Sequence, residues 1–223
     1  GPLRWLVGLF YLDRDEDAGQ SINPVGVPMP ADPNANVFYS RTLSSTRQLA
    51  GFLELGYELF DGFTVTGGVR VSKIDSDLTA IKAGALIGAY SSLSGDADET
   101  PVTPKLNVSY RLRDGALLYA QASKGFRIGG VNPGLPACGT CVVQLGTTFD
   151  SDSLWNYELG AKLEMFDRAL RLNAAAFYID WSEIQLNVSR EDGFNGFLNA
   201  GDARSRGGEL EVSLALGNGV EIG

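Results

Sequence analysis

Apolar and polar residues alternate at every second position along much of the chain. In residues 105–112 the apolar positions are Leu106, Val108, Tyr110 and Leu112. Successive side chains of a strand point to opposite faces, so this stretch is predicted to be a strand with one apolar and one polar face. Arg113-Asp114-Gly115 then has the composition of a tight turn. Alternation resumes from Ala116, which predicts a hairpin that opens into a Gly- and Pro-rich loop after Gly125.

The same unit recurs along the sequence. Further strands are expected at about residues 3–12, 47–59, 63–72, 153–166, 169–188 and from 209 onward. Tight turns are expected near residues 61, 114, 167 and 218, spaced by about 53, 53 and 51 residues. Long loops are expected at 13–46, 75–100 and 128–152, and a shorter one at 191–196. The apolar stretch 81–92 also suggests that the strands on either side of the second loop extend into it. Two strands, a turn and a loop per period differ from a solenoid or propeller repeat.

Charged residues recur on one face of strand after strand. Examples are Glu158, Lys162, Glu164, Glu209 and Glu211. Short turns fall on one side and long loops on the other, which is typical of an outer-membrane barrel with a wet lumen. Aromatic residues near strand ends suit the girdles of such a barrel. They are Trp5, Tyr11, Phe63, Trp155, Tyr157, Tyr178 and Trp181. A soluble antiparallel sandwich also alternates apolar and polar residues and remains the alternative.

Composition narrows the class of protein. The chain has 223 residues and a net charge of −9. No apolar run approaches the ~20 residues of a membrane-spanning helix. No signal peptide is visible, and because strand-like sequence reaches both ends we expect a piece of a longer protein. The acidic balance and the lack of a basic stripe argue against nucleic acid as a partner.

Catalytic chemistry finds little support. The chain has no histidine, which excludes Ser-His-Asp and Cys-His arrangements and histidine-bearing zinc sites. Glu209 and Glu211 are expected to share a solvated face rather than to act as an acid–base pair. The glycines at 125, 129 and 130 indicate a strand entering a loop, since no helix follows to make a phosphate site. We therefore expect no enzyme activity, no catalytic residue, no cofactor and no metal site.

Cys138 and Cys141 form the sharpest local motif. Their spacing would suit half of a four-cysteine zinc site or a redox motif. No second cysteine pair exists in the sequence. On an external loop the surroundings are oxidising, so we predict a small structural disulfide between these two residues.

Several strings resemble one family when they are taken in order. They are GFLELGYELFDGFTVTGGVRVS (51–72), TPKLNVSY (103–110), YAQASKGFRIGGVNP (119–133), LWNYELGAKLEMFDRALRLNAAAFYIDWSEIQLNV (154–188) and NAGDARSRGGELEV (199–212). Together they resemble the barrel of TonB-dependent outer-membrane receptors. The resemblance implies a barrel of about twenty-two strands closed by a plug, with import driven by TonB. Residues 1–223 would then be a partial barrel domain, without the plug, the TonB box and the remaining strands.

The expected fold is all-β: about eight strands, plus the start of a ninth, of a large antiparallel transmembrane barrel. The expected function is a receptor and transporter in the bacterial outer membrane that imports a scarce, bulky solute. By resemblance the expected cargo is an iron–siderophore or other iron complex, and cobalamin, other metal chelates and oligosaccharides are the alternatives. Expected partners are outer-membrane lipid, the TonB complex and the cargo, whose contacting residues the sequence does not identify. A passive porin-type barrel and a soluble structural or adhesive β-protein are the alternatives.

Overall fold

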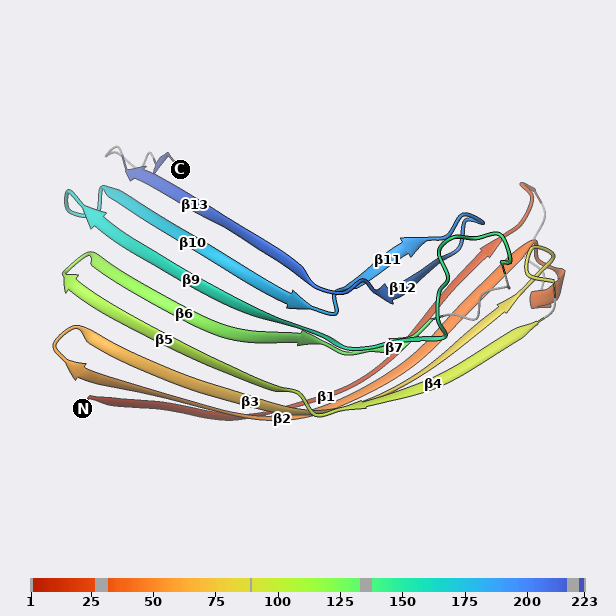
Figure 1. Cartoon of the computed structure of the whole chain (residues 1–223), viewed down its shortest axis with the longest axis horizontal. Coiled ribbons are helices and arrows are strands. Elements are labelled where there is room, and N and C mark those ends of the chain that lie inside the picture. The colour runs from red at the N-terminus through yellow and green to blue at the C-terminus, as the bar shows by residue number, and fades with distance from the viewer. Residues whose placement is uncertain (1, 27–31, 89, 133–137, 216–220, 223) are drawn as a thin grey trace.

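Long antiparallel strands form one curved, open sheet (Figure 1). The computed structural model describes residues 2–26, 32–88, 90–132, 138–215 and 221–222. The only helix in these ranges is a 3-10 turn, η1 (Pro33–Ala35). The strands are β1 (Leu3–Ile22), β2 (Phe38–Phe60), β3 (Phe63–Ala83), β4 (Ser91–Glu99), β5 (Val102–Arg113), β6 (Ala116–Arg127), β7 (Gly130–Val131), β8 (Thr148–Phe149), β9 (Asp152–Met165), β10 (Leu170–Ser182), β11 (Gln185–Ser189), β12 (Asn195–Asn199), β13 (Ala203–Ala215) and β14 (Glu221–Ile222).

The main sheet is a meander in which each strand pairs with the next long strand of the chain. Its order is β1-β2-β3-β5-β6-β9-β10-β13-β14, and β4 continues the edge of β3 beyond β5. β4 and β5 are one strand interrupted near Pro101, whose carbonyl accepts a hydrogen bond from the Ser72 amide at 3.1 Å. Counted this way, the sheet has eight long strands and the start of a ninth. The predicted fold class is confirmed, and the barrel is open in this chain.

One face of the sheet is apolar and exposed. The register places Val65 beside Val108, Ala120 beside Leu159 and Ala174 beside Leu210. Leu159 is 64% and Leu210 68% exposed. An exposed apolar surface spread over successive strands is typical of a barrel that faces lipid. We call this face outward, and the opposite, concave face inward.

The inward face carries polar side chains and aromatic rings that lie on glycines of neighbouring strands. A Cβ on Gly8 would overlap the ring of Phe52, and a Cβ on Gly160 would overlap that of Tyr119. Gly207 and Phe177 repeat the arrangement between β13 and β10. A ring that occupies the place of a missing Cβ covers the backbone of the neighbouring strand and projects less into the concave space.

The predicted turns lie at one end of the sheet. Gly62 and Gly115 both adopt φ +76°, which a residue with a side chain rarely does. The third turn uses three consecutive left-handed residues: Phe166, Asp167 and Arg168. These three turns are confirmed, and the one near residue 218 lies outside the described residues.

Several predicted boundaries are wrong. Residues 13–22 and 38–46 are strand rather than loop, because β1 and β2 pair over their whole length from Leu3↔Tyr57 to Ile22↔Phe38. Likewise β3 continues to Ala83 and pairs with β4 through most of the predicted 75–100 loop. The suggested extension of these strands is thus correct. The last long strand, β13, begins at Ala203 rather than near 209.

The predicted strand 169–188 is broken. It ends at Ser182 and resumes as β11, because Glu183 adopts φ +55° and turns the chain. Trp181 is also misassigned to a girdle. It pairs with Leu154 on the inward side, and the Arg127 guanidinium lies 4.9 Å from the centre of its ring.

The sheet divides into two arms on the side of the long loops. Pairing of β5 with β6 ends at Lys105↔Ser123, whereas β6 stays paired with β9 up to Arg127↔Asp152. β4 stays with β3, so β1–β4 form a long first arm (Figure 1). The segments carrying β7, β8, β11 and β12 form the second arm.

Candidate functional site

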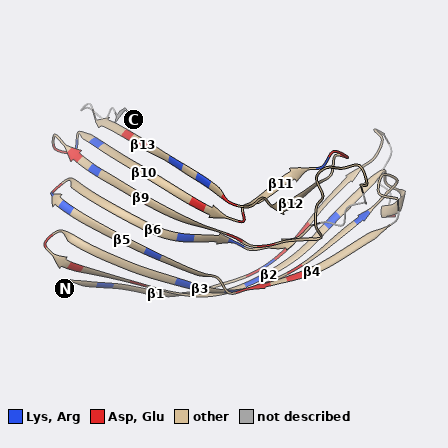
Figure 2. Ribbon diagram, in the orientation of Figure 1, with Lys and Arg blue, Asp and Glu red and all other residues tan. Residues whose placement is uncertain are grey.

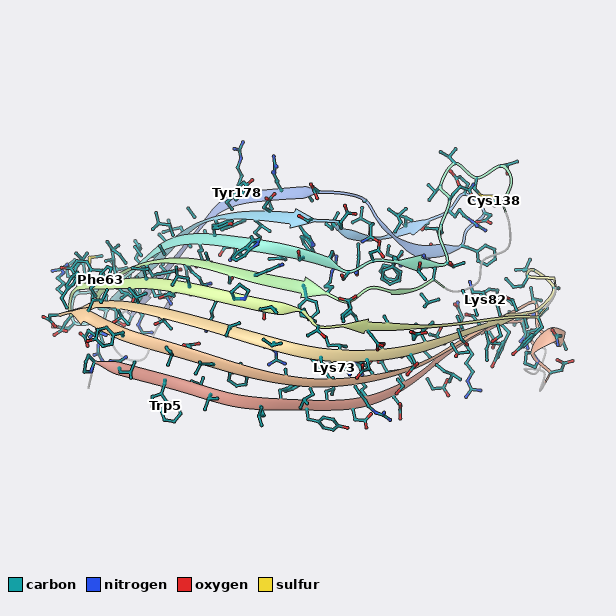
Figure 3. The ribbon with its side chains drawn as sticks, turned by 60° about the horizontal axis from the view of Figure 1, so that its bottom comes forward. Trp5, Phe63, Lys73, Lys82, Cys138 and Tyr178 are labelled. Carbon is teal, nitrogen blue, oxygen red and sulfur yellow. A yellow bond between two sulfur atoms is a disulfide. The ribbon has the colours of Figure 1, made fainter. Side chains whose placement is uncertain are left out.

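The two arms enclose the candidate site, on the side opposite the short turns. Figure 3 shows Phe63 at the turn end and both Lys82 and Cys138 at the other end. Both chain ends that Figure 1 marks lie on the turn side. Among the described residues, a ligand that arrives from the loop side would meet the arms and the inward face below them.

A pocket of about 420 Å³ lies between the arms. Its wall on β2 and β3 presents the hydroxyl groups of Thr42, Ser44, Thr46 and Ser76, beside the apolar side chains of Leu78 and Ala80. Two of these, Thr46 and Ser76, lie 3.2 Å apart through their side-chain oxygens. The opposing wall is mostly apolar and includes Ile128, Val131, Phe149 and Phe197. Hydroxyls can donate or accept hydrogen bonds, so the pocket suits a ligand with a polar edge and an apolar body.

Below the pocket, the inward face of β6, β9, β10 and β13 is concave and acidic. The hollow has a volume of about 690 Å³, and its lining includes Glu158, Glu209 and Glu211. The Tyr119 hydroxyl donates to Glu158 at 2.6 Å, and the Asn173 amide donates to Glu211 at 2.9 Å. These carboxylates share a wet wall, as the sequence predicts. Nothing in this arrangement resembles an acid–base pair aimed at one reacting atom.

A buried carboxylate fixes the base of the second arm. Asp152 has only 1% of its side chain exposed, and it accepts hydrogen bonds from the Arg127 guanidinium and from the Gln185 amide, the latter at 3.0 Å. The Gln185 side chain then donates to the carbonyls of Ile128 and Asp150, both at 2.9 Å. These bonds join β6, β9, β11 and the segment after β6. We call these three side chains, Arg127, Asp152 and Gln185, the base cluster.

A second buried side chain joins the two long external segments further up. Asn132 donates to the carbonyls of Gly146 at 2.9 Å and Phe197 at 2.7 Å, and its own carbonyl oxygen accepts from the Phe197 amide at 2.7 Å. The Phe149 and Phe197 rings stack with centroids 5.1 Å apart. Because these contacts use both segments, the apolar wall of the pocket is assembled before any ligand arrives.

The β11–β12 hairpin reaches across to the first arm. At its tip the Phe194 ring lies 6.2 Å from the Phe38 ring and 5.1 Å from the Lys82 ammonium. Lys82 is 4% exposed. Burial lowers the pKa of Lys82, the positive charge of Arg190 lowers it further, and Asp192 partly opposes both. The second arm is therefore held at its base and at its tip.

The cysteine pair lies in the second arm. The Sγ atoms of Cys138 and Cys141 are 1.97 Å apart, at bonding distance, and their Cα atoms are 5.4 Å apart. The Gln144 side chain donates to the Cys141 carbonyl at 2.6 Å, and the Glu191 carboxylate accepts from the Val142 amide at 3.2 Å. A nearby carboxylate makes this also the place where free thiols could gather a metal ion. We retain the disulfide as our proposal for this pair.

The residues that build the site carry little signal in the sequence. Asp152 and Asn132 fall in the predicted loop 128–152, and Gln185 falls near the end of the predicted strand 169–188, so nothing in the sequence marks these three polar residues as buried. They become buried only because segments far apart in the chain meet, as when Asn132 bonds Phe197. The pairing of Arg127 with Asp152 across two adjacent strands is the one signal that strand alignment could have found.

No described helix has the length and apolar character needed to cross a membrane. A family model described as "TonB dependent receptor-like, beta-barrel" matches residues 2–222. The chain is 29% identical over 212 residues to a pesticin receptor of Yersinia enterocolitica, covering 95% of this chain and 29% of that receptor. It is 29% identical over 149 residues to the metal-pseudopaline receptor CntO of Pseudomonas aeruginosa, covering 67% of this chain and 19% of that receptor.

The fold is also similar to a solved receptor. The crystal structure of the ferric yersiniabactin uptake receptor FyuA from Yersinia pestis aligns with a TM-score of 0.75 at 25% identity. The alignment covers 98% of this chain and 31% of that one. The chain thus spans less than a third of the length of the relatives it matches. Through the family match over residues 2–222, and with an open segment of barrel whose fold is similar to that of the solved receptor, this chain belongs to the β-barrel family of TonB-dependent receptors.

Proposed function

We propose that this chain forms part of an importer that takes up a scarce, bulky metal complex, with a ferric siderophore as its cargo. The relatives are receptors and transporters rather than enzymes, and family members are outer-membrane proteins. The family membership extends the proposal to coupling with TonB and to placement in the bacterial outer membrane. A whole receptor, longer than this chain, would carry out the uptake.

The pocket between the arms carries the proposal. It opens on the long-loop side, and a hydroxyl wall faces an apolar wall across about 420 Å³. A metal complex of an organic chelator has polar ligating groups and an apolar or aromatic body, which these two walls match. The relatives described as receptors for ferric yersiniabactin and metal-pseudopaline support this class of cargo.

A matched pair of substitutions tests the pocket. Ser44 lines it on β2, whereas the neighbouring Ser45 faces outward from the same strand, opposite Asp15. In the complete receptor, Ser44→Trp should fill the pocket and weaken binding of a ferric siderophore by about tenfold or more, equivalent to ~1.4 kcal/mol. Ser45→Trp should leave binding unchanged. Equal affinities for the two variants, measured by titration of purified receptor, would remove the pocket from the proposal.

Uptake kinetics test the transport mechanism. Import by the complete receptor should saturate at low ligand concentration and stop when the inner-membrane proton gradient is dissipated. A passive porin would show flux that rises linearly with concentration and ignores the gradient. Linear, gradient-independent flux of the metal complex would refute the importer. Induction of the gene by a shortage other than iron would change the cargo but leave the importer in place.

A further inference from the structure

The outward charges of the sheet begin where its apolar stretch ends on the loop side. On β6 this first charge is Lys124, after Leu118, Ala120 and Ala122. On β10 it is Asp180, and on β13 it is Arg206 followed by Arg204. Basic positions mark the loop-side halves of β6 and β13 in Figure 2. We call Lys124, Arg204 and Arg206 the outer basic row.

Strand register shows that these residues share one face. Arg204 is opposite Asp180, Asp180 is opposite Trp155, and Trp155 is opposite Lys124. Directly opposed residues of antiparallel strands lie on the same side of the sheet, and three strand spacings amount to about 14 Å. The outer basic row thus has its members on β6 and β13, and it spans four adjacent strands.

Aromatic rings lie beside the row, at the same levels of the sheet. The Trp155 and Tyr157 rings have centroids 6.1 Å apart, and those of Tyr157 and Tyr178 are 6.4 Å apart. Register sets Arg206 opposite Tyr178. Outward Trp and Tyr are enriched at the depth of lipid headgroups in membrane proteins. The basic side chains, which are level with these rings, therefore lie at headgroup depth.

The first arm handles its outward charges differently. There each outward cation is paired within the protein: Arg41 with Asp17 at 2.6 Å, Arg47 with Asp13 at 3.7 Å and Lys73 with Asp75 at 3.7 Å. In the outer basic row, Arg204 forms an ion pair with Asp180 at 3.1 Å, and the negative charge of Asp202 also attracts it. Lys124 and Arg206 have no ion pair among the residues the structure describes. The outer basic row keeps an excess of positive charge.

We propose that the outer basic row binds the phosphate groups of a phosphorylated lipid in the outer leaflet. The inference rests on the proposed placement of the chain in the outer membrane. Lys and Arg both bind phosphate oxygens, and the Arg fork can do so with two hydrogen bonds. A cation held in the headgroup layer is attracted by every nearby lipid phosphate, and its aliphatic stem can lie against the rings beside it.

The test compares two triple variants of the complete receptor. One replaces the row (Lys124→Gln, Arg204→Gln, Arg206→Gln), and its control replaces the paired outward cations of the first arm (Arg41→Gln, Arg47→Gln, Lys73→Gln). Each protein is reconstituted in phosphatidylcholine vesicles doped with diphosphorylated lipid A, extracted in mild detergent and weighed by native mass spectrometry. The wild type and the control should retain lipid A. The row variant should retain at least about tenfold less lipid A than they do.

Two further measurements show whether the bound phosphate belongs to the lipid or is free in solution. Dephosphorylated lipid A should not be retained by any variant, and excess inorganic phosphate should not displace the lipid. Equal lipid A retention by the two triple variants would overturn the proposal. If the row variant fails to fold, the single change Arg206→Gln should still reduce retention relative to Arg41→Gln. Cargo binding is measured on the same samples and should not change, so a failure of the importer proposal would show there and not in the lipid data.

Discussion

Leu159 and Gln121 lie on adjacent strands and face opposite media. Leu159 points outward and is 64% exposed, whereas Gln121 points inward opposite Glu158. Leu159→Arg should lower the free energy of unfolding of the complete barrel by about 2–4 kcal/mol, because it places a charge against hydrocarbon. Gln121→Arg should cost much less, since it adds a cation beside a carboxylate on the wet face. Reversible unfolding from a bilayer measures both, and equal costs would contradict the two faces.

Asp75 and Asp98 are directly opposite each other on the outward side of the first arm. The hydrogen bond that protonated Asp98 donates to Asp75, followed by the charges of Asp75 and Asp96, raises the pKa of Asp98, and Lys73 partly opposes this. A carboxyl whose pKa is raised by folding binds more protons in the folded state. Pairing of β3 with β4 should therefore weaken as pH rises from about 4 through the folded pKa of Asp98.

Asp98→Asn tests whether the Asp75–Asp98 pair makes the pairing of β3 with β4 depend on pH. The variant removes a carboxylate from a pair of like charges that face each other across the strands, so at neutral pH it should slow amide exchange in residues 74–82. It should also flatten the pH dependence of that exchange in the acid range. Faster exchange at neutral pH would show that Asp75 and Asp98 do not repel each other there.

The base cluster acts on whole elements rather than on a single residue. Asp152→Ala removes the acceptor for the Gln185 amide and for Arg127, so β11 should loosen from β9. A hydrogen bond to a charged group contributes about 1.5–3 kcal/mol, so the Gln185 amide should exchange roughly 10–100 times faster. The matched control is Asp150→Ala, because the Asp150 contacts to Gln185 and Asn199 use its backbone. Similar exchange rates of the Gln185 amide in both variants would show that the base cluster does not hold β11 against β9.

The cysteine pair should act only locally. A bridge between residues three apart removes little entropy from the unfolded chain, so Cys138→Ser with Cys141→Ser should leave barrel stability nearly unchanged. Intact mass of the non-reduced protein should be two hydrogens below the reduced value, without bound zinc. Two free thiols in protein taken from an oxidising compartment, or a zinc adduct, would overturn the proposed disulfide.

Elements with one apolar and one polar face were predictable, and elements with two polar faces were not. In residues 105–112 one face is apolar and the other polar, so the period of two reveals the strand. In β1 beyond Tyr11 both faces are polar, and Asp13, Asp15 and Asp17 look like a loop. Their strand is held by pairing with β2 and by ion pairs to Arg47 and Arg41, which lie more than twenty residues away. The pocket depends on such distant pairings, so the sequence did not predict it.

The whole molecule is an open sheet with two unsatisfied edges. At one edge, β1 pairs with β2 alone. At the other edge, β13 pairs with β10 along its length but with β14 only at Leu214 and Ala215. Backbone groups cannot remain unpaired in hydrocarbon, so these 223 residues expressed alone should not give a monodisperse, heat-resistant barrel in detergent micelles. Electrophoresis with and without boiling measures this. A heat-resistant monomer would mean that the sheet closes on itself as a small barrel.

Alternating faces also constrain how such a chain can change length. Deleting one residue inside β9 would move every later side chain of that strand to the other face and bring Glu158 and Lys162 against lipid. Deleting two would restore the faces and shift the register by one repeat. Descendants of this gene should therefore gain and lose strand residues in even numbers. Between Cys141 and Gly146, where no strand imposes this parity, additions and losses of any size can accumulate.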